Sequence, residues 1–84
     1  MGRWKGEVGV FLREDLLDPQ GRAIGEALHQ HGIPAVDTRM GKVIRFYLDH
    51  MDPELEKKIQ EMAEHFLANP VIESWEVRIE EGTA

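Results

Sequence analysis

Residues 42–67 read KVIRFYLDHMDPELEKKIQEMAEHFL, and this stretch decides the fold. In its first part apolar and polar residues alternate, which is typical of a strand with one buried face. The apolar members of that alternation are Ile44, Phe46 and Leu48. Asp52 then supplies a helix cap and Pro53 occupies the first helical position. We therefore expect a strand over 42–49 and a helix that begins at about residue 53.

The expected helix carries apolar residues at helical spacing on one side and charged residues on the other. The apolar stripe consists of Leu55, Ile59, Met62, Ala63, Phe66 and Leu67. Asn69-Pro70 ends the helix. The pattern predicts that the whole stripe, Phe66 included, is buried against a sheet.

The chain on either side of this stretch repeats the same two patterns. Alternating apolar residues predict strands over 3–13 and 74–80, and Asp18-Pro19 followed by an apolar stripe predicts a helix from about Pro19 to His31. Residues 35–40 are also β-prone. We expect this run to form a hairpin with the strand at 42–49, turning near Gly41.

The resulting order of elements, β-α-β-β-α-β, predicts an α+β fold of the ferredoxin-like, split βαβ type. It would be a sandwich with a four-stranded antiparallel sheet and both helices on one face. We expect one domain over residues 1–84, ordered from about 3 to 80, with a frayed tail at 81–84. The predicted buried sheet face consists of Val8, Val10, Leu12, Ile44, Phe46, Leu48, Trp75, Val77 and Ile79.

The opposite sheet face would be mixed in character, with both charges and a few apolar side chains. It would show Lys5, Glu7, Phe11, Arg13, Asp37, Arg39, Val43, Arg45, Tyr47, Glu76, Arg78 and Glu80. Water would solvate such a face, and complementary charges would equally allow it to pair with a second copy. The residues alone favour neither reading.

Composition narrows the classes of function. Of 84 residues, 42% are hydrophobic and 31% charged, and 10 basic against 16 acidic residues give a net charge of −6. This balance would repel a phosphate backbone, so nucleic acid is not an expected partner. The sequence has no cysteine, which excludes disulfides and thiolate zinc sites. No apolar run is long enough to suggest a membrane span, and we expect a cytoplasmic protein.

Catalytic and metal-binding patterns are weak. His29 and His31 are two residues apart on a predicted helix, so they point in nearly opposite directions and cannot share a metal ion. The loop Asp49-His50-Met51-Asp52 places two carboxylates near an imidazole, but Asp52 already has a role as a helix cap. We predict no catalytic, cofactor-binding or metal-binding residue in this chain.

Two glycine-containing segments have both a structural and a functional interpretation. Gly21 and Gly25 are spaced for close helix packing, and they lack the further residues of a phosphate-binding loop. Met40-Gly41-Lys42 predicts a tight turn, which could also present the lysine to a ligand or a subunit.

Three stretches together resemble the PurS family. They are Leu17-Asp18-Pro19-Gln20-Gly21 with Ala27-Leu28, then Arg39-Met40-Gly41-Lys42, then Leu67-Ala68-Asn69-Pro70-Val71-Ile72-Glu73. PurS is the small subunit of phosphoribosylformylglycinamidine synthase, also called formylglycinamide ribonucleotide amidotransferase. The order and separation of the three stretches carry the resemblance, which covers nearly the whole chain.

The resemblance implies a non-catalytic subunit of a carbon-nitrogen ligase complex in purine biosynthesis. The complex uses glutamine, ATP and magnesium to convert formylglycinamide ribonucleotide to formylglycinamidine ribonucleotide. The small subunit would bridge a glutaminase and an ATP-dependent synthetase, assist ammonia transfer and associate with itself as a dimer or higher oligomer. The candidate interface or signature residues are Asp18, Pro19, Gln20, Gly21, Arg39, Gly41, Lys42, Asn69, Pro70, Val71, Ile72 and Glu73. Two alternatives from other classes are a ligand-binding regulatory module of the same fold and an RNA-binding domain, the latter disfavoured by the acidic charge.

Overall fold

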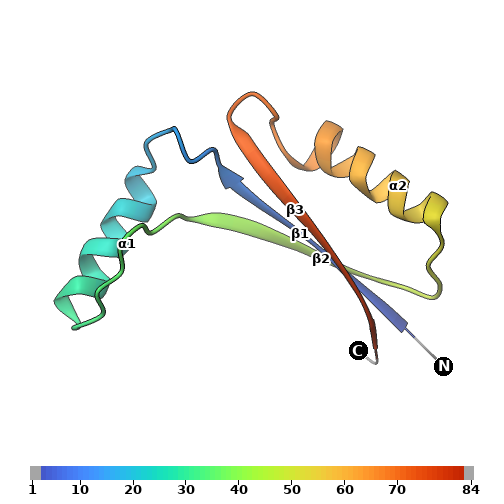
Figure 1. The fold of residues 1–84 in the computed structure, drawn as a ribbon, viewed down its shortest axis with the longest axis horizontal. Helices are drawn as coiled ribbons and strands as arrows, with labels where there is room; N and C mark the ends of the chain where they lie inside the picture. Colours follow the sequence, from blue (N-terminus) through green and yellow to red (C-terminus); the bar gives the residue numbers. More distant parts are fainter. Residues whose placement is uncertain (1–2, 83–84) are drawn as a thin grey trace.

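A computed structural model describes residues 3–82 as a three-stranded antiparallel sheet with two helices and a short π-helical turn (Figure 1). In chain order the elements are β1 (Arg3–Leu12), α1 (Pro19–Gln30), β2 (Gly41–Leu48), α2 (Pro53–Met62), η1 (Ala63–Leu67) and β3 (Glu73–Gly82). The strand order is β2-β1-β3. Because β1 is central, β2 and β3 each have one side without a neighbouring strand in the described sheet.

The strand register confirms the predicted buried face. Val8 lies between Ile44 of β2 and Val77 of β3, so these three side chains share one face of the sheet. This face packs against α2 and η1, and Val8 and Val10 at its centre are fully buried. The phenyl ring of Phe46 packs directly over Gly6 of β1, and a side chain at Gly6 would overlap this ring.

Both helices begin where the sequence predicts. The Asp18 side chain caps α1 by accepting from the Gly21 amide at 2.9 Å, and Asp52 caps α2 by accepting from the Leu55 amide at 2.8 Å. In each helix proline follows the cap at the first position, where its missing N–H has no helical partner to lose.

The predicted hairpin and fourth strand are wrong. Residues 35–40 form no strand, and β2 begins only at Gly41. Backbone groups of this segment bond to side chains instead of to another strand. The Met40 amide donates to Asp18, and the Ala35 carbonyl oxygen lies 2.6 Å from His29 Nε2. Side chains on and before α1 therefore hold residues 35–40 along that helix instead of in a sheet.

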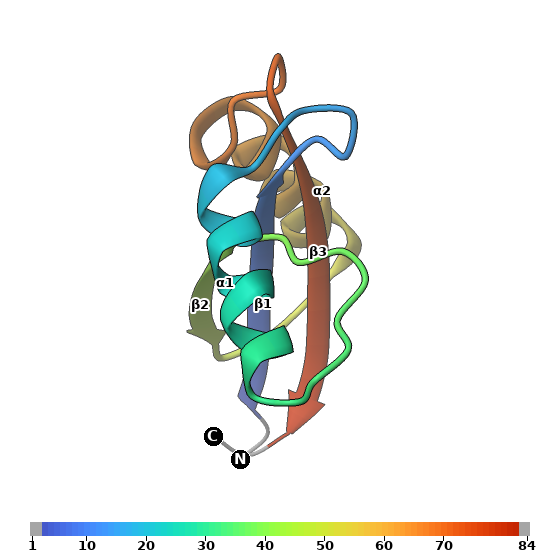
Figure 2. The same ribbon diagram turned by 90° about the vertical axis from the view of Figure 1, so that its left-hand side faces the viewer.

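The prediction that both helices cover one face is also wrong. Figure 1 shows α2 over the sheet, whereas α1 projects from one end of it, and Figure 2 shows α1 in front of the strands when viewed from that end. α1 has no extensive contact with any described strand, and Ile24 on its apolar stripe is 42% exposed. We call α1 with residues 31–38 the arm.

The two ends of the last strand differ from the prediction as well. β3 continues through Glu81 and Gly82, which the sequence suggested would fray. The rest of the predicted tail, residues 83 and 84, lies outside the described residues.

Candidate functional site

Asp18 joins the arm to the sheet. One carboxylate oxygen accepts from Gly21 at 2.9 Å, and the other accepts from the Met40 amide at 2.8 Å, 22 residues along the chain. These two backbone donors, Met40 first, hold the pKa of Asp18 below its ordinary value. A charged Asp18 therefore fixes where α1 begins relative to the start of β2.

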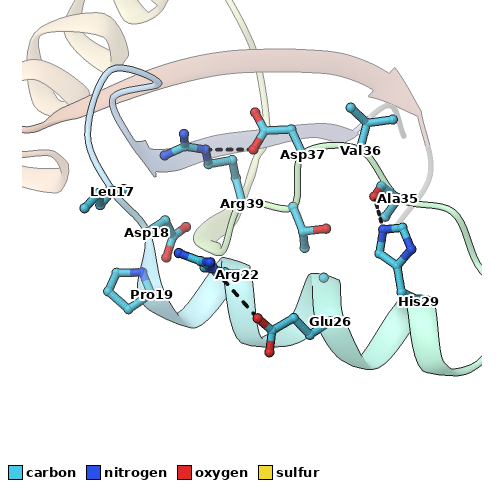
Figure 3. A pocket seen from close by; sticks show the side chains of 12 residues that line it. Leu17, Asp18, Pro19, Arg22, Glu26, His29, Ala35, Val36, Asp37 and Arg39 are labelled. Atoms are coloured by element: carbon cyan, nitrogen blue, oxygen red, sulfur yellow. Dashed lines mark hydrogen bonds and ion pairs between the residues drawn. The ribbon is translucent and has the colours of Figure 1, made fainter.

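Arg39 also stabilises the connection between α1 and the start of β2, which we call the joint. Its guanidinium donates to the carbonyl oxygens of Leu16 at 2.6 Å and Glu14 at 2.9 Å, and it pairs with Asp37 at 3.3 Å (Figure 3). The geometry suits the planar fork of arginine, which presents several donors at fixed angles.

Two signature glycines are required by close backbone approach at this joint. A side chain at Gly21 would overlap the Thr38 carbonyl oxygen, and one at Gly41 would overlap the Val10 carbonyl oxygen and the Phe11 ring. Gly21 is buried against the chain itself, whereas Gly41 is exposed at the surface. Gly21 lets α1 lie close to residues 38 and 39, and Gly41 lets the start of β2 lie close to the end of β1.

The signature stretch 69–73 builds a self-contained turn. The Asn69 side chain accepts from the Val71 amide at 3.1 Å, and the Glu73 side chain accepts from the Asn69 amide at 2.7 Å. Pro70 lies between them at a position that needs no donor in this network. The stretch therefore has a structural role that the sequence left unspecified.

The joint and the turn meet at one end of the sheet. Arg13 connects them: its backbone N–H donates to Ile72 O at 2.9 Å, and its side chain donates to Val71 O at 3.2 Å. We call the surface formed by residues 13–18, 38–42 and 68–73 the sheet end. Arg13, predicted only as a strand residue of the exposed face, has no sequence signal that reveals this role.

A shallow groove of about 220 Å³ opens at the sheet end. Its lining combines apolar and polar side chains: Val10, Leu12, Asp18, Gln20, Met40, Gly41, Lys42 and Glu73. Five of the candidate residues named from the sequence thus line this groove. Gly21 is buried, Pro19 and Arg39 line a second groove described below, and residues 69–72 form the turn beside the first groove. Met40 was not among the predicted site residues.

A larger groove of about 400 Å³ lies in the arm, between α1 and residues 35–39 (Figure 3). Four of its charged side chains are paired, with Arg22 3.8 Å from Glu26 and Arg39 3.3 Å from Asp37, and Asp18 accepts backbone amides. The Nε2 atom of His29 is hydrogen-bonded to the Ala35 carbonyl oxygen. The acidic and basic side chains of this groove are therefore mostly engaged with one another or with the backbone.

Other candidate chemistry stays dispersed within residues 3–82. No three His, Asp or Glu side chains in this range are grouped to hold a metal ion. His50 lies 3.8 Å from Asp52 on an exposed loop, and Asp52 also caps α2. None of the helices described is long and apolar enough to cross a membrane.

The exposed sheet face carries one tight ion pair. Arg45 Nε donates to Glu7 Oε2 at 2.6 Å, and this hydrogen bond lowers the pKa of Glu7. Lys5 lies 3.9 Å from Glu80 on the same face. Charge pairs within the chain therefore satisfy part of the face that the sequence left open between solvent and self-association.

The face toward α2 is less complete. An apolar groove of about 320 Å³ remains between β2 and α2. It is lined by Ile44, Phe46, Leu48, Leu55, Lys58, Ile59, Met62 and Leu67. Apolar surface at the arm and at this groove thus lies uncovered in the single chain.

Together the fold and these surfaces define a small α+β protein whose grooves and exposed apolar surfaces are suited to contacts with other chains. Residues 5–81 match the family model described as PurS, phosphoribosylformylglycinamidine (FGAM) synthase. The chain belongs to the PurS family.

Individual relatives agree over nearly their full length. The chain is 40% identical to phosphoribosylformylglycinamidine synthase subunit PurS of Bacillus subtilis, covering 96% of this chain and 98% of that protein. It is 44% identical to PurS of Mycobacterium leprae, covering 83% and 87%. Among solved structures, that of PurLQS from Thermotoga maritima contains a chain with 30% identity and a TM-score of 0.79, covering 95% of this chain and 100% of that chain.

Proposed function

We propose that this chain is the small, non-catalytic subunit of a phosphoribosylformylglycinamidine synthase, and that it bridges a glutaminase and an ATP-dependent synthetase. The observation that carries the proposal is the match to the PurS family model over residues 5–81. A similar chain also takes part in the PurLQS structure from Thermotoga maritima.

The proposed role is physical. The glutaminase releases ammonia, and the synthetase uses ATP and magnesium to install that nitrogen in formylglycinamide ribonucleotide. A subunit that holds both enzymes together raises the concentration of ammonia at its acceptor without performing a chemical step. The complex would act in purine biosynthesis, in the cytoplasm.

A reconstituted assay tests this role. With glutamine as nitrogen source, we expect formation of the amidine product by the glutaminase and synthetase to require this chain. With a high concentration of an ammonium salt instead, the synthetase should work without it. Equal glutamine-dependent rates with and without the chain would contradict the proposal.

We propose further that two copies associate, with α1 of each lying in the apolar groove of the other. The accessible surface of the chain is 6495 Å², whereas a compact monomer of this mass exposes about 5,100 Å². Its radius of gyration is 15.9 Å, against about 12 Å for a compact chain of this length. The apolar stripe of α1 and the apolar groove beside β2 match in character, and the single chain covers neither fully.

Sedimentation of one matched pair of variants tests the dimer. Ile24→Lys places a charge on the apolar stripe of α1 and should yield a monomer. Gln30→Lys adds the same charge at an exposed position of the same helix and should leave the dimer intact. A monomeric parent protein at micromolar concentration would refute this arrangement.

A further inference from the structure

One edge strand of the sheet has a sequence that is complementary to itself. β3 packs against β1 and η1, and its other side has no neighbouring strand in the described sheet. When two identical strands pair antiparallel about a twofold axis, residues at equal distances before and after the axis lie opposite each other. The position of the axis along β3 therefore decides which side chains meet.

An axis at Val77 brings matching side chains together. On the exposed face, Glu76 of each copy then lies opposite Arg78 of the other. On the face toward η1, Trp75 of each copy lies opposite Ile79 of the other. Opposite charges and apolar pairs that face each other directly across two strands stabilise the pairing.

Other positions of the axis bring together side chains that do not match. An axis at Glu76 or Arg78 places that residue opposite its own copy, and like charges in directly opposite positions are destabilising. An axis at Trp75 or Ile79 places Val77 opposite a glutamate. The side chains of β3 thus favour the register about Val77.

The two charged residues have no competing ion pair within the described chain. Glu76 lies opposite Gly9 of β1, which offers no side chain. Arg78 lies opposite Glu7, whose carboxylate is already hydrogen-bonded to Arg45 at 2.6 Å. Glu76 and Arg78 are both exposed, so both can pair with a second copy.

The other edge strand does not share this property. β2 carries Lys42 and Arg45 and no acidic residue, so two copies of β2 would bring only positive charges together. The apolar side chains of β3 are also incompletely covered, since Trp75, Val77 and Ile79 are each half-buried. Pairing of β3 with its own copy would cover them further.

We propose that β3 pairs with β3 of a second copy of this chain, antiparallel and about a twofold axis at Val77, so that the two three-stranded sheets form one continuous sheet. This contact goes beyond the proposed function and differs from the proposed arm contact, which uses α1 and the groove beside β2. A single strand edge with exposed ion pairs makes a small interface. We therefore expect association through β3 at millimolar but not at micromolar protein concentration.

A cysteine placed on the axis tests the register. The chain contains no cysteine, so Val77→Cys gives each copy a single thiol. The register places the two Cα atoms at this position about 4.5–5.5 Å apart, within the range that a disulfide spans. Under oxidising conditions at millimolar concentration, we expect Val77→Cys to form disulfide-linked pairs of chains.

Ile79→Cys is the matched control, because it lies on the same strand and the same face and is also half-buried. Its counterpart on the second copy would be displaced by about 13 Å along the strand, which is too far for a disulfide. We expect it to cross-link about tenfold more slowly or less. Equal rates for the two variants, faster cross-linking of Ile79→Cys, or no cross-link from either would each overturn the proposal.

An exchange of charges tests the same contact without a cysteine. Glu76→Arg and Arg78→Glu each place like charges across the axis, and each should abolish the association that sedimentation of the parent detects at millimolar concentration. The double variant restores opposite charges in reverse order and should associate as the parent does. Single variants that associate like the parent, or a double variant that does not recover, would contradict the ion pairs.

Ile24→Lys separates this contact from the arm contact. Combined with Val77→Cys, it should leave the cross-linking rate nearly unchanged, because α1 takes no part in the pairing of β3. Loss of the cross-link in the combined variant would show that the arm brings the two thiols together, and it would overturn the proposal. None of these measurements requires the enzyme subunits, so their outcome is independent of the proposed function.

Discussion

At the scale of single residues, most of the signature residues form hydrogen bonds or close contacts within the chain. Several signature side chains form hydrogen bonds with backbone groups of the same chain, namely Asp18, Arg39 and Glu73. Gly21 and Gly41 are needed where backbone passes against backbone. The polar side chains of the signature therefore act largely within the chain, by holding its segments in place.

Gly21→Ala should lower the free energy of unfolding. Alanine favours a helix over glycine by about 1 kcal/mol, but its methyl group would overlap the Thr38 carbonyl oxygen. Overpacking against backbone costs about 1–3 kcal/mol, so the net change should be destabilising. Urea unfolding measures it, with Gly82→Ala as the control because that position has open space. Equal stability of the two variants would contradict the close approach.

The stability of the protein should fall in acid partly through Asp18. Its pKa is lowered in the folded chain by the amides of Met40 and Gly21, so the unfolded chain takes up the proton first as the pH drops. The contribution of Asp18 is present above the unfolded pKa of about 3.9 and disappears below it.

Comparing the parent with Asp18→Asn checks this sign. The variant should be less stable at neutral pH, and the difference should shrink as the pH falls from about 5 to about 3. Asp49→Asn serves as a control, because Asp49 accepts no described hydrogen bond. A difference between parent and Asp18→Asn that stays constant with pH would show that the carboxylate charge is not involved.

At the scale of elements, local patterns located the helices and three strands well. Each helix start is encoded locally by an aspartate cap followed by proline, at Asp18-Pro19 and at Asp52-Pro53. These local signals do not depend on the rest of the fold. The run 35–40 is β-prone by composition, yet its partners are Asp18 and His29, which periodicity does not reveal. The family resemblance supplied a set of candidate residues, but which of their side chains bond within the chain and which are exposed depends on three-dimensional placement.

The burial predicted for Phe66 is wrong for an identifiable reason. η1 closes with a hydrogen bond from Ala68 N to Ala63 O at 3.0 Å, five residues apart, so its turn is wider than that of an α-helix. The wider turn shifts the apolar stripe by one position. Leu67 and Ala68 take the inward places, and Phe66 is left 77% exposed.

Phe66→Ser should therefore change the free energy of unfolding by less than about 0.5 kcal/mol, as an exposed position does. Val10→Ala, at the buried centre of β1, should cost about 2 kcal/mol or more through lost burial and a cavity. Chemical unfolding of both variants provides the comparison. A large loss of stability in Phe66→Ser would place the phenyl ring in the core after all.

At the scale of the whole molecule, the chain is open and elongated. It measures 45 × 30 × 14 Å, and Val8 and Val10 are its largest fully buried side chains in the described range. So thin a core gives a single chain limited stability, and the proposed association of two copies would add to it.

The melting temperature should consequently depend on protein concentration. Raising the concentration about a hundredfold should increase the melting temperature by roughly 5–10 °C if two copies associate. Ile24→Lys should show a lower melting temperature that does not change with concentration. Calorimetry over a dilution series makes the measurement, and a parent melting temperature independent of concentration would indicate a self-sufficient monomer.

The two strand edges of the sheet have a consequence for the life of the protein in the cell. β2 and β3 each present a row of backbone donors and acceptors with no neighbouring strand in the described chain, and such rows are templates on which other chains can pair. A copy made in excess of its partners is therefore at risk of aggregation or proteolysis. We expect the amount of this subunit in a cell to follow the amount of its partners, because surplus copies would be cleared before they accumulate.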